Sequence, residues 1–266
     1  MEGFNSYCRF RNNYRILNPI GEGSYGKVFA AERLRDGVRV ALKYVDCQRN
    51  INGIRIPKEI ILLMKTQHID GVIKVLDYFS FNQKYVIVME MYPTDLFDFI
   101  KKGVKECVAR NFFRQIMDIV RECDKAQVIH GDIKPENILV RHDLQLVLTD
   151  FGSGLKSNET PSNSFFGTKD FLPPEWIVRG FYDGRKATVW SLGILLYFML
   201  FADVPFHTNE EVVRCKLYLP NSITNECKDL ISKCLSAHPE CRLDYEGILE
   251  HPWMNESKLE KCIDSV

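Results

Sequence analysis

The sequence predicts an α+β fold of two lobes, a small β-rich lobe followed by a larger helical one. Its 266 residues are enough for one large domain or two lobes. Before residue 92, short runs of β-branched and aromatic residues predominate, and after it apolar residues recur at helical spacing. We therefore expect an N-terminal extension at 1–13, a first lobe at 14–91, a second lobe at 92–255 and a C-terminal tail at 256–266.

Local patterns justify each element of the first lobe. Runs rich in β-branched and aromatic residues predict five strands, at 14–20, 26–31, 38–45, 72–80 and 85–91. A helical stretch at 57–65, with Pro57 in its first turn, interrupts these strands.

The second lobe carries apolar residues three or four positions apart. This spacing predicts one helix through Val108, Phe112, Ile116, Ile119 and Cys123, and another through Ile223, Cys227, Leu230 and Cys234. A short hairpin, 138–140 with 144–148, interrupts the helices. The longest apolar run, 190–202, is too short to cross a bilayer and predicts a buried helix. A cleft between two such lobes is a natural ligand site.

Composition narrows the range of partners. The chain is 45% hydrophobic and 26% charged, which is typical of a globular protein and excludes a disordered one. The chain has 35 basic and 35 acidic residues, so its formal net charge is zero. It therefore has no overall positive charge that would attract nucleic acid or an anionic membrane. We expect neither as a partner, and we expect a monomer.

The cysteines and the N-terminal residues bear on location. The nine cysteines are scattered and none forms a C-x-x-C pair, so we expect free thiols rather than a disulfide framework or a zinc cluster. Free thiols are typical of a reducing compartment. The N-terminal residues lack the apolar core of a signal peptide. We expect a cytoplasmic location, with the nucleus as an alternative.

The first motif with chemical meaning is the glycine-rich segment G-E-G-S-Y-G-K-V at 21–28. Gly21, Gly23 and Gly26 fit the pattern G-x-G-x-x-G, which alone is weak because it occurs in dinucleotide-binding turns and in ordinary glycine-rich turns. Here a strand follows rather than a helix, which disfavours a dinucleotide site. The hairpin that results can lay its backbone over phosphates, because glycine lacks a Cβ.

Lys43 ends the segment V-A-L-K at 40–43. Alone, a lysine at this position is better explained as a solvated surface residue. Glu59 in the predicted helix offers it a partner. Such a pair would hold the Lys43 ammonium against the phosphates of a nucleotide.

The strongest motif is H-G-D-I-K-P-E-N at 130–137, followed by D-F-G at 150–152. Asp132 is spaced to act as a catalytic base that accepts a proton from a hydroxyl. Asn137 and Asp150 supply the oxygen ligands that Mg²⁺ prefers.

Taken in order, these motifs and P-P-E at 173–175 resemble the protein-kinase signature set over residues 14–255. The resemblance implies the bilobal protein-kinase-like fold, with ATP and Mg²⁺ as cofactors. It implies that Lys134 steadies the transferred phosphate and that Thr168 orients Asp132 and Lys134, as in the serine/threonine branch. Val40, Ala41 and Leu139 are suited to sandwich the adenine ring, Met89 is expected at the back of its pocket, and Glu90 belongs to the adjoining hinge. Val28 ends the glycine segment that is expected to cover ATP. Ala41, Met89 and Leu139 would look the same in an ordinary core.

Other stretches are similar to the Pim kinase family, namely D-L-F-D-F-I at 95–100, W-S-L-G-I-L-L-Y at 190–197 and H-P-W-M at 251–254. This resemblance implies protein substrates with basic residues before the phosphorylated Ser or Thr. The acids expected to bind substrate arginines are Asp95, Asp98, Glu136 and Asp203. Each is equally well explained as a solvated surface acid.

Three positions depart from the kinase pattern. Most kinases have an Arg where Gly131 stands, and that Arg pairs with a phosphorylated loop residue. We therefore expect activity that does not depend strongly on phosphorylation of Ser157, Thr160, Ser162 or Ser164. Thr188 stands where kinases usually have an Asp that braces the catalytic loop, an Asp that Pim kinases also lack. Pro93 lacks a backbone N–H and so removes one hydrogen-bond donor from the hinge. Which hinge N–H would contact adenine is therefore left undecided.

We expect an active enzyme, and we weigh a pseudokinase-like nucleotide-binding module with weak turnover against it. Gly131 motivates that alternative because glycine adds backbone freedom. Lys43, Asp132, Asn137 and Asp150 disfavour it, because pseudokinases commonly lack part of this set. A dinucleotide-binding enzyme is the weaker alternative. We expect structural roles for His130, as a packed and hydrogen-bonded residue, and for a buried ion pair of Glu175 with Arg242.

Overall fold

The computed structural model describes residues 2–23, 26–46, 49–50, 53–54, 56–81, 84–159, 163 and 167–255. Outside these ranges lie Ser24 and Tyr25 of the glycine segment, three of the loop hydroxyls (Thr160, Ser162 and Ser164) and the predicted tail at 256–266. The chain divides into two compact units, Met1–Pro93 and Thr94–Val266.

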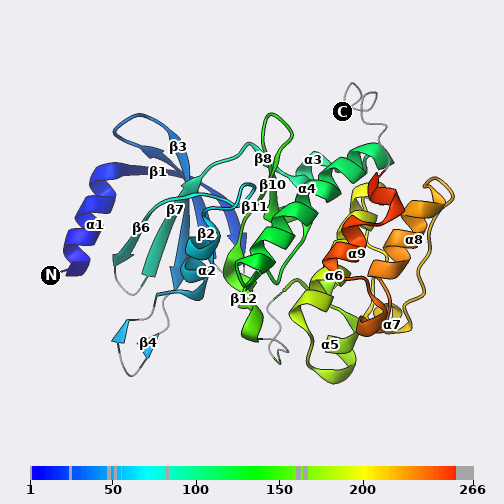
Figure 1. Cartoon of the computed structure of the whole chain (residues 1–266). Coiled ribbons are helices and arrows are strands. Elements are labelled where there is room, and N and C mark those ends of the chain that lie inside the picture. The colour runs from blue at the N-terminus through cyan, green and yellow to red at the C-terminus, as the bar shows by residue number, and fades with distance from the viewer. Residues whose placement is uncertain are drawn as a thin grey trace. The chain divides into compact units, whose positions relative to one another are not determined.

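The first unit is built on an antiparallel sheet with the strand order β1-β2-β3-β7-β6 (Figure 1). Its elements are α1 (Glu2–Asn13), β1 (Tyr14–Gly23), β2 (Gly26–Arg33), β3 (Arg39–Asp46), β4 (Arg49–Asn50), β5 (Gly53–Ile54), α2 (Lys58–Thr66), β6 (Val75–Phe81) and β7 (Lys84–Glu90). The five strands and the helix predicted from the sequence are present, with ends that differ by a few residues.

Alternation along β3 sends neighbouring side chains to opposite faces of this sheet. Leu42 belongs to a core cluster that includes Phe10 of α1, whereas Lys43 contacts Glu59 of α2. The two helices therefore cover opposite faces. The sequence analysis did not predict α1, yet Phe10 is 1% exposed and packs against the rings of Tyr14 and Phe79. This helix is part of the core of the first unit.

The second unit is mainly helical. Its helices and strands are β8 (Thr94–Asp95), α3 (Leu96–Phe99), α4 (Glu106–Lys125), β9 (Val128–Ile129), β10 (Ile138–Val140), β11 (Leu146–Leu148), β12 (Leu155–Lys156), α5 (Pro174–Arg179), α6 (Gly184–Phe201), α7 (Asn209–Arg214), α8 (Asn225–Cys234) and α9 (Tyr245–Leu249). Short 3-10 helices are η1 (Pro135–Asn137), η2 (Phe151–Ser153), η3 (Ser157–Glu159), η4 (Lys169–Phe171), η5 (Pro239–Cys241) and η6 (Pro252–Asn255). Helices α4 and α8 form where the apolar spacing predicted them, and the predicted hairpin is present as β10–β11.

Helix α6 is the buried helix predicted from the apolar run. Its Trp190 is fully buried, stacks on Phe206 and lies beneath the Arg242 guanidinium. Arg242 also forms the predicted ion pair with Glu175, through two buried hydrogen bonds of 2.6 and 2.9 Å. Within the described ranges, no helix has both the length and the apolar character that a membrane span requires.

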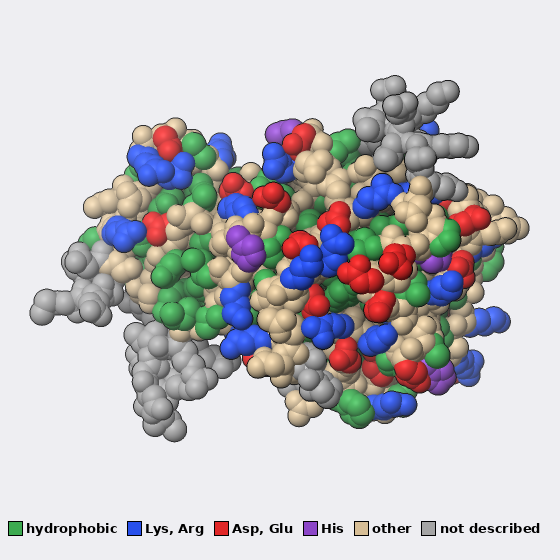
Figure 2. All heavy atoms as spheres, in the orientation of Figure 1, with side chains coloured by type: hydrophobic (Ala, Val, Ile, Leu, Met, Phe, Trp, Pro, Cys, Tyr) green, Lys and Arg blue, Asp and Glu red, His purple; other side chains and the backbone are tan. Residues whose placement is uncertain are grey.

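Surface charge and cysteines complete the picture of the fold. On the face of the second unit seen in Figure 2, basic and acidic side chains are intermixed, in line with the zero net charge. Of the cysteines that the structure describes, six are free, namely Cys8, Cys123, Cys215, Cys227, Cys234 and Cys241. Cys107 is disulfide-bonded, so the expectation of free thiols is wrong at this position. Spacing along a sequence does not show which cysteines a fold brings together.

Candidate active site

The glycine segment forms a hairpin in the first unit, as its sequence context predicted. Gly21 pairs with Val28, and Gly23 pairs with Gly26, across β1 and β2. Gly26 has a φ of +137°, and a Cβ on it would lie 1.9 Å from the carbonyl oxygen of Tyr44. Only glycine fits this position, because the close approach of β3 leaves no space for a Cβ on residue 26.

Lys43 and Glu59 form the predicted pair. The Lys43 Nζ lies 2.6 Å from Glu59 Oε1, and the two side chains are only 5% and 4% exposed. Glu59 sits in the first turn of α2, where helix geometry points it at β3. A lysine and a carboxylate buried together compensate each other's desolvation, which fixes the direction of the Lys43 side chain.

The other predicted nucleotide-binding residues of the first unit lie on adjacent strands. Val28 pairs with Lys43 across β2 and β3, and Ala41 pairs with Met89 across β3 and β7. Ala41 and Met89 are buried. The N–H of Glu90 donates to the carbonyl oxygen of Lys74, and the Glu90 carboxylate accepts a 2.6 Å hydrogen bond from the Tyr92 hydroxyl.

Asp132 is the centre of a hydrogen-bonded cluster in the second unit. Its Oδ1 accepts from the backbone N–H of Thr168 at 2.8 Å, and its Oδ2 accepts from the amide nitrogen of Asn137 at 2.9 Å. Lys134 Nζ lies 3.0 Å from Asp132 Oδ2 and 2.5 Å from the Thr168 hydroxyl. These contacts connect the three predicted catalytic residues, Asp132, Lys134 and Thr168, with Asn137, one of the two predicted metal ligands.

His130 links this cluster to Asp150, the other predicted metal ligand. Its Nε2 meets the carbonyl oxygen of Thr149 at 2.8 Å, while its Nδ1 accepts from the N–H of Asp132 at 3.2 Å. The imidazole also packs edge-on against Phe151, with ring centroids 4.7 Å apart. Its buried, hydrogen-bonded role was predicted. Asp150 itself has a φ of +61° and accepts from the N–H of Gly152, which turns the chain at this point.

Gly131 adopts a left-handed conformation, with a φ of +80°. A Cβ on this residue would lie 2.5 Å from the carbonyl oxygen of Ser153. The segment that follows Asp150 therefore packs directly on the backbone of Gly131. Any other residue here would require one of the two segments to shift.

The predicted magnesium ligands fit Mg²⁺ by their chemistry. The amide nitrogen of Asn137 donates to both the carbonyl and the carboxylate of Asp132, so its amide oxygen is the group suited to a metal. One amide oxygen and one carboxylate match an ion that takes most of its remaining ligands from phosphate and water. The described residues contain no group of three or more His, Cys, Asp or Glu that could hold a metal on its own.

The four predicted substrate acids lie on adjoining elements of the second unit. Asp95 caps α3 by accepting from the N–H of Asp98 at 2.8 Å, and burial raises the pKa of Asp95. Asp98 is exposed, and its Oδ1 lies 3.1 Å from the Nζ of Lys101. Glu136 is exposed on η1, which contacts α3. Asp203 is exposed just after α6, whose Phe198 stacks on Phe97 of α3.

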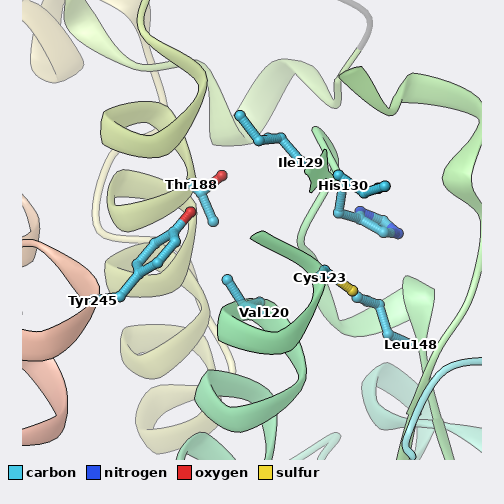
Figure 3. A pocket seen from close by; sticks show the side chains of 8 residues that line it. Val120, Cys123, Ile129, His130, Leu148, Thr188 and Tyr245 are labelled. Carbon is cyan, nitrogen blue, oxygen red and sulfur yellow. The ribbon is translucent and has the colours of Figure 1, made fainter. Parts of the chain in front are cut away.

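Two further positions of this unit bear on the site. Leu139, predicted to contact adenine, lies on β10, is half-buried and pairs with Asp95 of β8. Tyr245, which the sequence analysis did not single out, lines a small cavity together with Thr188 (Figure 3). The departure from the kinase pattern at Thr188 was visible in the sequence, but Tyr245 comes from a helix far along the chain.

Comparison with known proteins identifies the family. The family described as "Protein kinase domain" matches residues 14–254. Serine/threonine-protein kinase prk-2 of Caenorhabditis elegans is 39% identical over 97% of this chain and 62% of its own length. Serine/threonine-protein kinase pim-2 of Danio rerio is 37% identical over 94% of this chain and 87% of its own length. Sperm motility kinase 2B of Mus musculus is 31% identical over 93% of this chain and 53% of its own length.

This chain thus spans less than two thirds of prk-2 and about half of sperm motility kinase 2B. The predicted α+β fold, with a β-sheet unit followed by a helical one, is confirmed, and so is the resemblance on which it was based. The chain belongs to the protein kinase family, among the serine/threonine kinases.

Proposed function

We propose that this chain is an active, ATP- and Mg²⁺-dependent protein serine/threonine kinase of the Pim type. The observation that carries this proposal is the cluster around Asp132, whose two carboxylate oxygens are oriented by Thr168, Asn137 and Lys134. A carboxylate fixed in this way is suited to receive a proton from a hydroxyl.

In the proposed reaction, the substrate hydroxyl gives its proton to a carboxylate oxygen of Asp132. The hydroxyl oxygen bonds to the γ-phosphorus while the bond to ADP breaks. Lys134, held 3.0 Å from Asp132 and 2.5 Å from the Thr168 hydroxyl, places its positive charge beside the transferred group. Catalysis then comes from positioning and electrostatics, with no covalent intermediate on the protein.

The nucleotide is proposed to bind through the first-unit residues. The backbone of the β1–β2 hairpin approaches the phosphates where glycine leaves it uncovered, and Lys43, fixed by Glu59, pairs with the α- and β-phosphates. Asn137 and Asp150 would hold Mg²⁺, which neutralises phosphate charge when bound.

Protein substrates rich in arginine are proposed to meet the four acids of the second unit. Asp98, Glu136 and Asp203 are exposed, and Asp95 lies beside Asp98. A carboxylate and a guanidinium pair in a bidentate way, which favours arginine over lysine. The resemblance to the Pim family, which implies such substrates, supports this assignment.

Activity is proposed not to require loop phosphorylation. Gly131 offers no cation to a phosphate, and its packing on Ser153 excludes a side chain at that position. We expect phosphatase treatment of the purified chain to leave its kcat within about two-fold of the untreated value. Loss of activity after this treatment would contradict the proposal.

A nucleotide-binding scaffold with weak turnover is the second candidate, because glycine at position 131 could loosen the catalytic loop. The structure disfavours it. Gly131 is packed against Ser153, and Asp132 makes the bonds that an ordered loop requires.

The deciding experiment is Mg²⁺-dependent transfer of labelled γ-phosphate to a serine peptide preceded by arginines. We expect transfer by the wild-type chain and a loss of about 100-fold or more in the variant Asp132→Asn. Asp143→Asn is the matched control, since Asp143 is 54% exposed in the β10–β11 turn. Equal rates for the wild type and Asp132→Asn would refute the assignment of the base, and preference for an acidic peptide would refute the substrate class.

A further inference from the structure

The turn between β2 and β3 lies against the end of α1, at one end of the sheet of the first unit. The N–H of Leu34 donates to the carbonyl oxygen of Asn13 at 2.9 Å, which ties the turn to the junction of α1 with β1. The N–H of Arg33 donates to the carbonyl oxygen of Val38 at 2.9 Å and closes the turn. Residues 9–15 and 33–39 thus form one surface, which we call the turn surface.

The turn surface is rich in arginine, although the whole chain has no net charge. Its arginines are Arg9, Arg11, Arg15, Arg33, Arg35 and Arg39. All of them except Arg33 are exposed. In Figure 2, basic side chains lie close together over the turn that joins β2 to β3. The zero net charge of the chain therefore conceals a local concentration of cations.

Carboxylates offset only part of this positive charge. Those that pair with arginines of the turn surface are Glu32, Asp36 and Asp77. Asp36 alone engages both Arg33 and Arg35, at 2.8 and 3.3 Å. Within the described ranges, Arg11 and Arg39 form no ion pair with a carboxylate. The arginines thus outnumber the carboxylates that pair with them, and the excess of positive charge attracts anions.

Two aliphatic side chains are exposed on the same turn. Leu34 is 47% exposed and Val38 is 44% exposed. Between them, a Cβ added to Gly37 would meet nothing within 4 Å, so the tip of the turn is open to solvent. The turn surface therefore combines a convex tip that carries apolar side chains with arginines on both sides of it.

An anionic lipid surface matches this combination. Peripheral proteins bind such a surface by burying apolar side chains among the headgroups while their cations pair with lipid phosphates. A nucleic acid would engage the arginines but would leave Leu34 and Val38 without an apolar partner. An acidic peptide typically binds in a groove or along a sheet edge, whereas the tip of this turn is convex. The aliphatic tip thus favours lipid over either polymer.

We propose that the turn surface docks the first unit on an anionic lipid membrane. Leu34 and Val38 enter the headgroup region, and the arginines around them pair with lipid phosphates. The glycine hairpin lies at the opposite end of β2 and stays uncovered when the turn surface is docked. The proposal departs from the expectation of no membrane partner, which was based on the net charge of the whole chain.

The first test is sedimentation of the full chain with phosphatidylcholine vesicles that contain or lack about one third phosphatidylserine. We expect the chain to bind the anionic vesicles alone, and we expect this binding to weaken as the salt concentration rises. The triple variant Arg11→Gln/Arg35→Gln/Arg39→Gln is expected to lose about ten-fold or more in affinity for the anionic vesicles. Wild-type binding that is the same with and without phosphatidylserine would overturn the proposal.

A matched control separates the turn surface from the overall charge of the chain. The variant Lys84→Gln/Arg141→Gln/Arg214→Gln loses the same charge at exposed positions of other elements. It is expected to bind the anionic vesicles as the wild type does. Equal affinities of the two triple variants would show that the turn surface is not the binding site. Thermal denaturation of both variants verifies that each is folded.

The variant Leu34→Ser/Val38→Ser tests insertion of the apolar tip. We expect weaker binding to the anionic vesicles with an unchanged dependence on salt, because apolar burial is lost and charge is retained. Unchanged affinity would contradict insertion. Tighter binding of the wild type to double-stranded DNA or polyglutamate than to the anionic vesicles would assign the surface to that polymer and refute the lipid. None of these measurements uses ATP or a protein substrate, so their outcome is independent of the proposed function.

Discussion

At the scale of single residues, two charged groups of the candidate site, Lys43 and Asp132, are buried and paired. Lys43 is 4% exposed and Asp132 is 6% exposed, which would be costly for either charge alone. Glu59 compensates Lys43, and Lys134, Asn137 and Thr168 compensate Asp132. Motif spacing predicted which residues belong to the set. It could not predict Gly131 packing on Ser153, because that contact depends on how two loops meet.

Gly131 gives a sharp test at this scale. We expect Gly131→Ala to lower the free energy of unfolding by about 1–3 kcal/mol, since alanine is strained at a φ of +80° and its Cβ would meet the Ser153 carbonyl oxygen. We also expect kcat to fall, because the strain is adjacent to Asp132. Chemical denaturation and steady-state kinetics measure the two effects.

Gly180→Ala is the matched control for this substitution. Gly180 has a φ of +68°, but a Cβ added to it would meet nothing within 4 Å, so the substitution introduces only the backbone strain. Equal destabilisation by both substitutions would show that the contact with Ser153 contributes nothing.

At the scale of elements, the strands of the first unit and the long helices of the second form where the sequence patterns predicted them, whereas α1 was not predicted. The alternating runs of the first unit and the three-to-four spacing of α4 each carry a strong local signal. In α1, Tyr7 and Phe10 are spaced for one helix face, but charged and polar residues surround them. The buried position of Phe10 depends on β6 and on the sheet, which short-range pattern does not reveal.

The contribution of α1 can be measured through Phe10. We expect Phe10→Ala to reduce the free energy of unfolding of the first unit by about 3–5 kcal/mol, because a fully buried ring is replaced by a cavity. Thermal and chemical denaturation test this. Arg11→Ala, at an exposed position of the same helix, is expected to change stability by less than about 0.5 kcal/mol. A Phe10→Ala protein as stable as the wild type would show that α1 does not contribute to the core.

At the scale of the whole molecule, the order of motifs along the chain predicted both the fold class and the family. It did so because each motif fixes a residue whose chemistry phosphate transfer requires, and several together in one order are specific. Composition was informative about the globular state but not about individual contacts. The disulfide-bonded state of Cys107 and the proximity of Thr188 to Tyr245 around one cavity both depend on the fold, and local patterns carry no signal for either.

The central claim is the proposed phosphate transfer, which is expected to need Lys43 of the first unit and Asp150 of the second. Its most direct test is single-turnover transfer of labelled γ-phosphate by Lys43→Met from the first unit and Asp150→Asn from the second. Lys84→Met and Asp143→Asn are the controls, because these side chains are 56% and 54% exposed. The account predicts that each of the first two variants loses about 100-fold or more in rate while both controls match the wild type. A wild-type rate in either Lys43→Met or Asp150→Asn would contradict it.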